Sequence, residues 1–137
     1  MLKRLGASFA DLNYSYCGSV HSVPGSEISK ITELAEQYGT NSDLIVVNSG
    51  INNLLNGYSV ANCMREYERM YEGIRNSCTA AHVAFASVSY IARDEFTNID
   101  QSGVINPLVE ELNAQLESYC QQNDYTIPTD KGWLTLF

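Results

Sequence analysis

The hydrophobic positions of the chain form short continuous runs separated by longer stripes with helical spacing. Apolar runs occupy residues 43–48 and 81–88, and turn-prone residues bound each of them. Continuous runs of this length predict strands that are buried on both faces, as in a parallel sheet. Weaker runs at 14–20 and at 125–127, the latter stopped by Pro128, predict two further strands.

The segments between these runs carry apolar residues at intervals of three and four, which predicts amphipathic helices. The first helix is expected over 28–38, and Gly39 is suited to end it. The second is expected over 60–74, with Ser59 as its N-cap. Its charged face is interpreted as a surface exposed to solvent.

A third helix is expected over 108–120, with Asn106 as the N-cap and Pro107 at the first helical position. Strands and helices therefore alternate, which predicts βαβ units and an α/β fold with a parallel sheet. Ligand sites in such sheets form at the carboxyl ends of the strands. This rule selects the loop around Gly25 and the loop 48–57.

Composition and charge limit the classes of function. The chain has 137 residues, of which 45% are hydrophobic and 18% charged, so we expect a single globular domain over 1–137. A net charge of −8 argues against nucleic-acid partners and anionic membrane surfaces, because both would repel the chain. Neither a long apolar run nor a signal peptide is visible, so a cytoplasmic location is expected.

The four cysteines, Cys17, Cys63, Cys78 and Cys120, contain no C-x-x-C pair. Their spacing therefore gives no zinc motif, and no metal is expected. The simplest interpretation is that they are small buried hydrophobic residues in a reducing compartment. Their even number leaves disulfides open if the protein is exported.

The segment 47–57 offers the clearest candidate chemistry. A hydrophobic strand ends, Gly50 allows a turn, and Asn52 follows two residues later. An asparagine amide held at a rigid strand end can donate a hydrogen bond to an oxyanion. The alternative is that glycine and asparagine only form a turn.

With these residues in place, the chain resembles the SGNH, or GDSL-type, hydrolase family of esterases and lipases. Gly50-Ile51-Asn52-Asn53 is similar to the family's Gly-x-Asn-Asp block. The segment 23–28 is similar to the family's block with a glycine at the start of the first long helix. The strand ending at Ser87-Val88 and the helix containing Asn113 also fit, so the resemblance covers roughly residues 1–127.

The resemblance implies a three-layer α/β/α fold with a flavodoxin-like parallel sheet. It also implies that Gly25 donates a backbone N–H and Asn52 a side-chain N–H to an oxyanion hole. The family hydrolyses carboxylic esters through an acyl-enzyme, without a metal or other cofactor. The implied partner is therefore a small ester or acyl ligand.

The chain departs from the family at both ends. The family's Gly-Asp-Ser block is imitated only by Gly6-Ala7-Ser8, and no strand precedes it. Ser8 is therefore a weak candidate nucleophile, and the first strand of the fold is expected upstream of Met1. The Asp-x-x-His block is absent, since no histidine follows Asp130, and 128–137 is a divergent tail.

The remaining candidates for a base do not fit the pattern. His21 precedes the glycine block, and His82 begins a strand at the far end of the sheet. Asn53 stands where the family has aspartate, which is expected to remove a polar anchor of the site. A serine hydroxyl without a base is a weak nucleophile at neutral pH.

The sequence thus predicts a truncated or degenerate SGNH-type ester hydrolase domain that has no catalytic residues and is inactive. The alternative is a noncatalytic small-ligand-binding or scaffold domain on the same fold. A third possibility is another flavodoxin-like module, such as a receiver domain. That class needs an acidic cluster after the first strand, where Asp11 stands alone.

Overall fold

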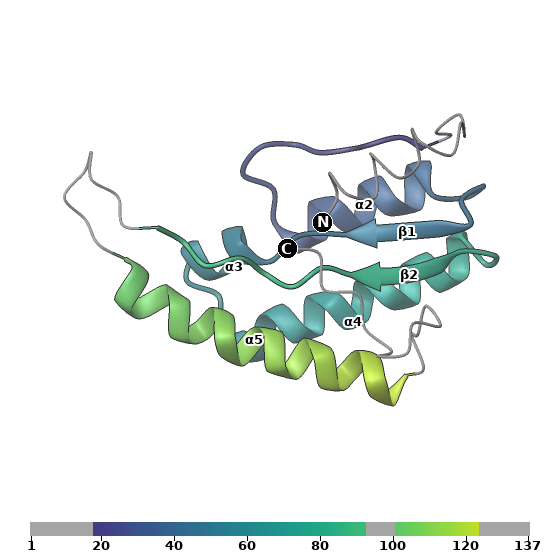
Figure 1. The fold of residues 1–137 in the computed structure, drawn as a ribbon. Coiled ribbons are helices and arrows are strands. Elements are labelled where there is room, and N and C mark those ends of the chain that lie inside the picture. Colours follow the sequence, from purple (N-terminus) through teal and green to yellow (C-terminus); the bar gives the residue numbers. More distant parts are fainter. Residues whose placement is uncertain (1–17, 93–100, 124–137) are drawn as a thin grey trace, which may run out of the picture.

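A computed structural model describes residues 18–92 and 101–123 of the chain. This part is mixed α/β, as the sequence predicted (Figure 1). Four helices and a two-stranded parallel sheet follow one another in the order α2 (Ile28–Tyr38), β1 (Leu44–Val47), α3 (Ile51–Leu55), α4 (Val60–Ser77), β2 (His82–Phe85) and α5 (Ser102–Gln122).

The two strands pair in parallel, which confirms the predicted βαβ connection. Leu44 lies opposite His82 and Val47 opposite Phe85. The pairing continues at the carboxyl end, where the Ala86 N–H donates to the Val47 carbonyl at 2.7 Å. Of the strand expected over 14–20, residues 18–20 have no regular structure, and the rest lies outside the described residues, as does 125–127.

The burial of the two strands differs. In β2, Val83, Ala84 and Phe85 are all buried, as expected for a strand covered on both faces. In β1 that expectation is wrong, because Leu44 and Val46 are 47% and 44% exposed. The other β1 side chains face the helices, so β1 alternates like a strand with one covered face.

Helix α4 packs against both α2 and α5, and Figure 1 shows α4 and α5 running beside each other below the strands. The helix-facing residues of the sheet belong to the same hydrophobic core as the helices. The described residues therefore make one sheet layer and one helix layer. Fully buried side chains of this core include Ile28, Tyr67, Ile74, Phe85, Leu112 and Leu116.

Two predicted helix ends are confirmed. The Ser59 hydroxyl accepts a hydrogen bond from the Asn62 N–H at 3.1 Å and caps α4. Gly39 ends α2 with φ −89°, so a left-handed backbone is not the reason for glycine there. A Cβ at Gly39 would lie 2.5 Å from the Ala35 carbonyl oxygen and 2.6 Å from Ile45 Cδ1. Close packing explains this glycine.

The predicted start of the third helix is wrong. Helix α5 begins at Ser102, so Pro107 lies inside it and Asn106 is not its cap. Pro107 is the sixth helical residue, and its missing N–H leaves the Gly103 carbonyl without one intrahelical bond. The Asn106 side chain instead bonds to the backbone of Ile91, an interaction that local capping rules do not reveal.

The described cysteines Cys63, Cys78 and Cys120 are free thiols and at most 1% exposed, which confirms their expected burial. Burial raises the pKa of Cys63 to about 11 and that of Cys120 to about 12. Cys17 lies outside the described residues.

These raised pKa values predict slow thiol chemistry. In a Cys17→Ser variant at pH 8, a disulfide reagent should modify the native chain far more slowly than the urea-unfolded chain, because thiolate and access are both lacking. Equal labelling rates of native and unfolded protein would contradict this expectation.

The same cysteines make stability depend on pH. Unfolded thiols titrate near 9.0 and the native ones higher. Stability should therefore hold below about pH 9 and decline as the pH rises toward 11. A free energy of unfolding that does not fall between pH 9 and pH 11 would contradict this expectation.

Candidate functional site

The loop before α2 and the short helix α3 meet beyond the carboxyl end of β1. The Asn52 amide donates a hydrogen bond to the Ser26 carbonyl at 2.9 Å. The Asn56 amide donates to the Glu27 carboxylate at 2.7 Å. Two asparagines of one short segment thus hold two consecutive residues at the entry to α2, although 26 and 29 residues separate the partners.

Asn53 completes this arrangement, and its expected role is corrected. The sequence suggested that asparagine here removes a polar anchor. Instead, the side-chain Oδ1 of Asn53 accepts a hydrogen bond from the Ile28 N–H at 2.9 Å, and the residue is only 1% exposed. It satisfies a free N–H in the first turn of α2, whose own N-cap residue Glu27 makes no side-chain cap bond. Asn53 is therefore an anchor of the site.

The two residues expected to form the oxyanion hole lie on the two segments that meet here, Gly25 in the loop before α2 and Asn52 in α3. Gly25 has φ +74°, and no atom lies within 4 Å of a Cβ placed on it, so the space beside it is open. Asn52 bonds to the residue directly after Gly25. A primary amide has two N–H groups, so the bond to Ser26 leaves one Asn52 N–H for another acceptor.

A buried serine that no sequence motif indicates lies two residues after β1. Ser49 is 9% exposed, and its hydroxyl has no hydrogen-bond partner within the described residues. Its carbonyl accepts a hydrogen bond from the Tyr67 hydroxyl, whose ring packs edge-on against Phe85 at 5.6 Å between ring centres. Burial raises the pKa of Tyr67, so the phenol stays a donor.

The segment after β2 is fixed by two asparagines of α5. Asn113 accepts from the Val88 N–H at 2.7 Å and donates to the Val88 carbonyl at 2.9 Å. Asn106 makes the same pair of bonds with Ile91, at 2.9 and 3.1 Å. Asn106 and Asn113 are seven residues apart, about two helical turns, so they project from the same side of α5. These side chains thus bond to backbone groups that neither described strand pairs with.

Neither histidine lies at the carboxyl end of the strands. His82 is the first residue of β2, at the amino end of the sheet. His21 stacks on Tyr38, the last residue of α2, with 3.8 Å between ring centres. Its Nε2 lies 2.9 Å from the Ser19 hydroxyl oxygen, and this exposed pair sits at the end of α2 opposite to the Gly25 loop. Within the described part, no histidine can act as base for a group bound beside Asn52.

Other predicted features can be located only in part. Ser8 and Asp130 lie outside the described residues. Where the chain is described, no group of three His, Cys, Asp or Glu side chains could hold a metal ion. Among residues 18–92 and 101–123, no helix has the length and apolar character needed to cross a membrane.

Comparison of the chain with protein-family models, with curated proteins and with solved structures gives no match in any of the three.

Proposed function

We propose that the chain is an SGNH-type ester hydrolase domain that binds a small ester or acyl ligand and does not hydrolyse it. In this proposal the backbone N–H of Gly25 and the free N–H of Asn52 bind the ligand's carbonyl oxygen. The complete fold would be the three-layer, flavodoxin-like arrangement of that family. The supporting observation is the hydrogen bond from Asn52 to Ser26, which holds the amide beside Gly25.

The absence of turnover follows from the chemistry of acyl transfer. Oxyanion donors stabilise a tetrahedral intermediate, but that intermediate forms only when an activated nucleophile attacks. The Ser49 hydroxyl is buried and has no base beside it in the described residues. The Ser19–His21 pair has the two groups, but it lies away from the two oxyanion donors.

We expect hydrolysis of p-nitrophenyl acetate by the full chain to equal the buffer blank at pH 7–8. Release of p-nitrophenol is followed by absorbance, with a Ser19→Ala variant measured alongside. Turnover above the blank that disappears in Ser8→Ala would contradict the proposal and identify Ser8 as a nucleophile. Turnover that disappears in Ser19→Ala would contradict it equally.

Ligand binding at the two donors is tested separately. Methyl acetate should shift the NMR signals of the Gly25 N–H and the Asn52 amide saturably, and Asn52→Ala should abolish the response at Gly25. Asn56→Ala is the control on the same segment, because the Asn56 amide donates to the side-chain carboxylate of the neighbouring residue Glu27, whereas Asn52 donates to the Ser26 backbone carbonyl. Loss of binding in both variants, or in neither, would count against the role of Asn52.

A noncatalytic scaffold domain is the second candidate. It is favoured by the hydrogen bonds of Asn52, Asn53 and Asn56, which all have structural partners. The methyl acetate titration separates the two, since a scaffold would show no saturable response.

A further inference from the structure

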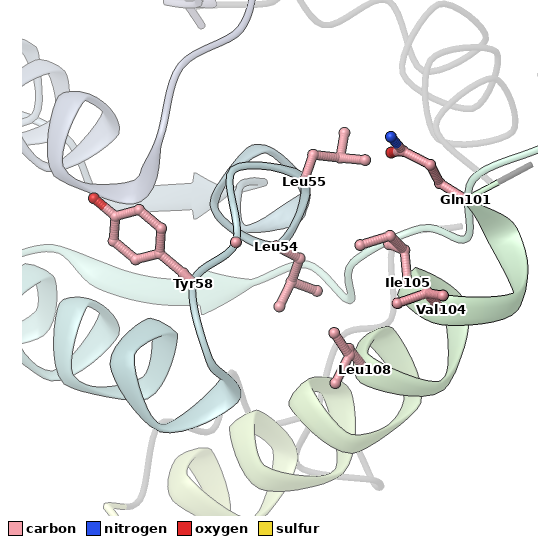
Figure 2. Close-up of a pocket in the computed structure, with 8 residues that line it drawn as sticks. Leu54, Leu55, Tyr58, Gln101, Val104, Ile105 and Leu108 are labelled. Carbon is pink, nitrogen blue, oxygen red and sulfur yellow. The ribbon is translucent and has the colours of Figure 1, made fainter. Parts of the chain in front are cut away.

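A groove with an apolar lining runs between α3 and the first turns of α5 and contains neither Gly25 nor Asn52. Its volume is about 370 Å³, which is within the size range of small-molecule sites. The lining consists of Leu54, Leu55, Gly57, Tyr58, Gln101, Val104, Ile105 and Leu108 (Figure 2). None of these side chains carries a charge.

The groove has a buried floor and an exposed rim. Leu54 and Ile105 are 2% and 7% exposed and form part of the hydrophobic core. Leu55 and Val104 are 40% and 68% exposed. Figure 2 shows the two α3 leucines facing the α5 side chains across the open space. An aliphatic group placed there would cover apolar surface on both helices at once.

Two carboxylates, those of Glu27 and Glu66, act on Tyr58 in the groove lining. The Tyr58 hydroxyl is hydrogen-bonded to the Glu27 carboxylate and points away from Leu54 in Figure 2. That bond and the negative charges of Glu27 and Glu66 raise the pKa of Tyr58. The chain as a whole carries a net charge of −8. A carboxylate brought to this groove would meet like charges and no cation in the lining.

We propose that the α3–α5 groove binds the aliphatic part of a small uncharged ligand, such as an alkyl ester or alcohol, and discriminates against aliphatic carboxylates. The choice of an ester rests on the proposed function, whereas binding of an alkyl chain does not. The segment Ile51–Leu55 connects the two sites, because it carries both Asn52 and the groove leucines.

The test is an NMR titration of the full chain with 1-hexanol, methyl hexanoate and hexanoate at pH 7, where hexanoate is ionised. The methyl signals of Leu54, Leu55, Val104 and Ile105 should shift saturably with the two uncharged probes. Hexanoate should bind at least about tenfold more weakly because of like-charge repulsion. No saturable shift with either uncharged probe, or equal binding of hexanoate, would overturn the inference.

A pair of valine substitutions makes the test specific. Val104→Asp places a charge on the rim and should weaken hexanol binding at least about fivefold, because the alkyl chain would then cover a charged group. The residue is exposed and lies in the first turn of α5, where an acidic side chain favours the helix. Val20→Asp is the control, since Val20 is 85% exposed and is not in the groove. Equal weakening by both substitutions would overturn the inference.

The same titration separates this inference from the proposed function. Hexanol has no carbonyl, so its response at the groove does not depend on Gly25 or Asn52. If only the proposed function fails, methyl hexanoate shifts the groove signals and leaves those of Gly25 and Asn52 unchanged. If only the groove inference fails, methyl acetate shifts Gly25 and Asn52, and hexanol shifts nothing at the groove.

Discussion

Replacing Gly50 with alanine is expected to destabilise the fold by about 3–5 kcal/mol. Gly50 has φ +118° and ψ −32°, a region that residues with a Cβ avoid. An added Cβ would also collide with the Tyr67 hydroxyl and would lie 3.0 Å from Val88 Cγ2. The strain and the collision act together, because the loop is packed between α4, α5 and the segment after β2. Urea unfolding, followed by circular dichroism, measures the change.

Gly57→Ala is the matched control for this prediction. Gly57 also has a positive φ, +87°, but nothing lies within 4 Å of a Cβ placed on it. Only the strain of a positive φ applies there, so a loss of about 1–2 kcal/mol in the free energy of unfolding is expected. A Gly50→Ala loss no larger than that of Gly57→Ala would show that the loop relaxes away from Tyr67. The packing described around Gly50 would then be wrong.

The regular elements could be predicted because their signals are local. Apolar residues at helical spacing predicted α2 and α4. A serine directly before the second of these stripes predicted the Ser59 cap. The parallel pairing of β1 and β2 followed from their separation by a helix. The exposure of Leu44 and Val46 could not be predicted, because it depends on which layers cover β1 and not on its own composition.

The errors arose where long-range hydrogen bonds replace local rules. Asn106 before Pro107 is a typical helix start, but Asn106 is used to bind Ile91, and α5 begins at Ser102. Helix α3 has only five residues, which is too short for a periodic pattern. The sequence of this segment therefore predicts a loop.

The sequence selected the two segments that meet beyond β1, but it did not indicate the side chains that join them. The rule that sites form at the carboxyl ends of parallel strands selected the segments of Gly25 and Asn52, and these segments meet through the bond to Ser26. The partners of Asn53 and Asn56 are 25 and 29 residues away in the chain. No spacing rule links residues at such separations, so the anchoring role of the asparagines became visible only in the structure.

The second large effect is expected from Asn113, which bonds to both backbone groups of Val88. Val88 is 2% exposed, so Asn113→Ala leaves a buried N–H and a buried carbonyl without partners. We expect a loss of about 2–4 kcal/mol in the free energy of unfolding. Gln115→Ala is the control on the same helix. Its amide donates to the Glu111 carboxylate on the exposed surface, and a change within about 0.5 kcal/mol is expected.

Asn113→Asp turns the same contact into a pH-dependent one. The ionised carboxylate still accepts from the Val88 N–H, but it has no donor for the Val88 carbonyl and faces that oxygen with a negative charge. The protonated acid has an O–H that can replace the lost donor, so the native state should raise the pKa of Asp at this position above its ordinary value of about 3.9. A raised native pKa means that the native state binds the proton more tightly, so the variant gains stability relative to the parent as the pH falls. The difference in unfolding free energy between parent and variant should therefore be largest near pH 7 and shrink toward about pH 4. A difference that stays constant or grows on acidification would mean that the Val88 carbonyl does not depend on the donor at position 113.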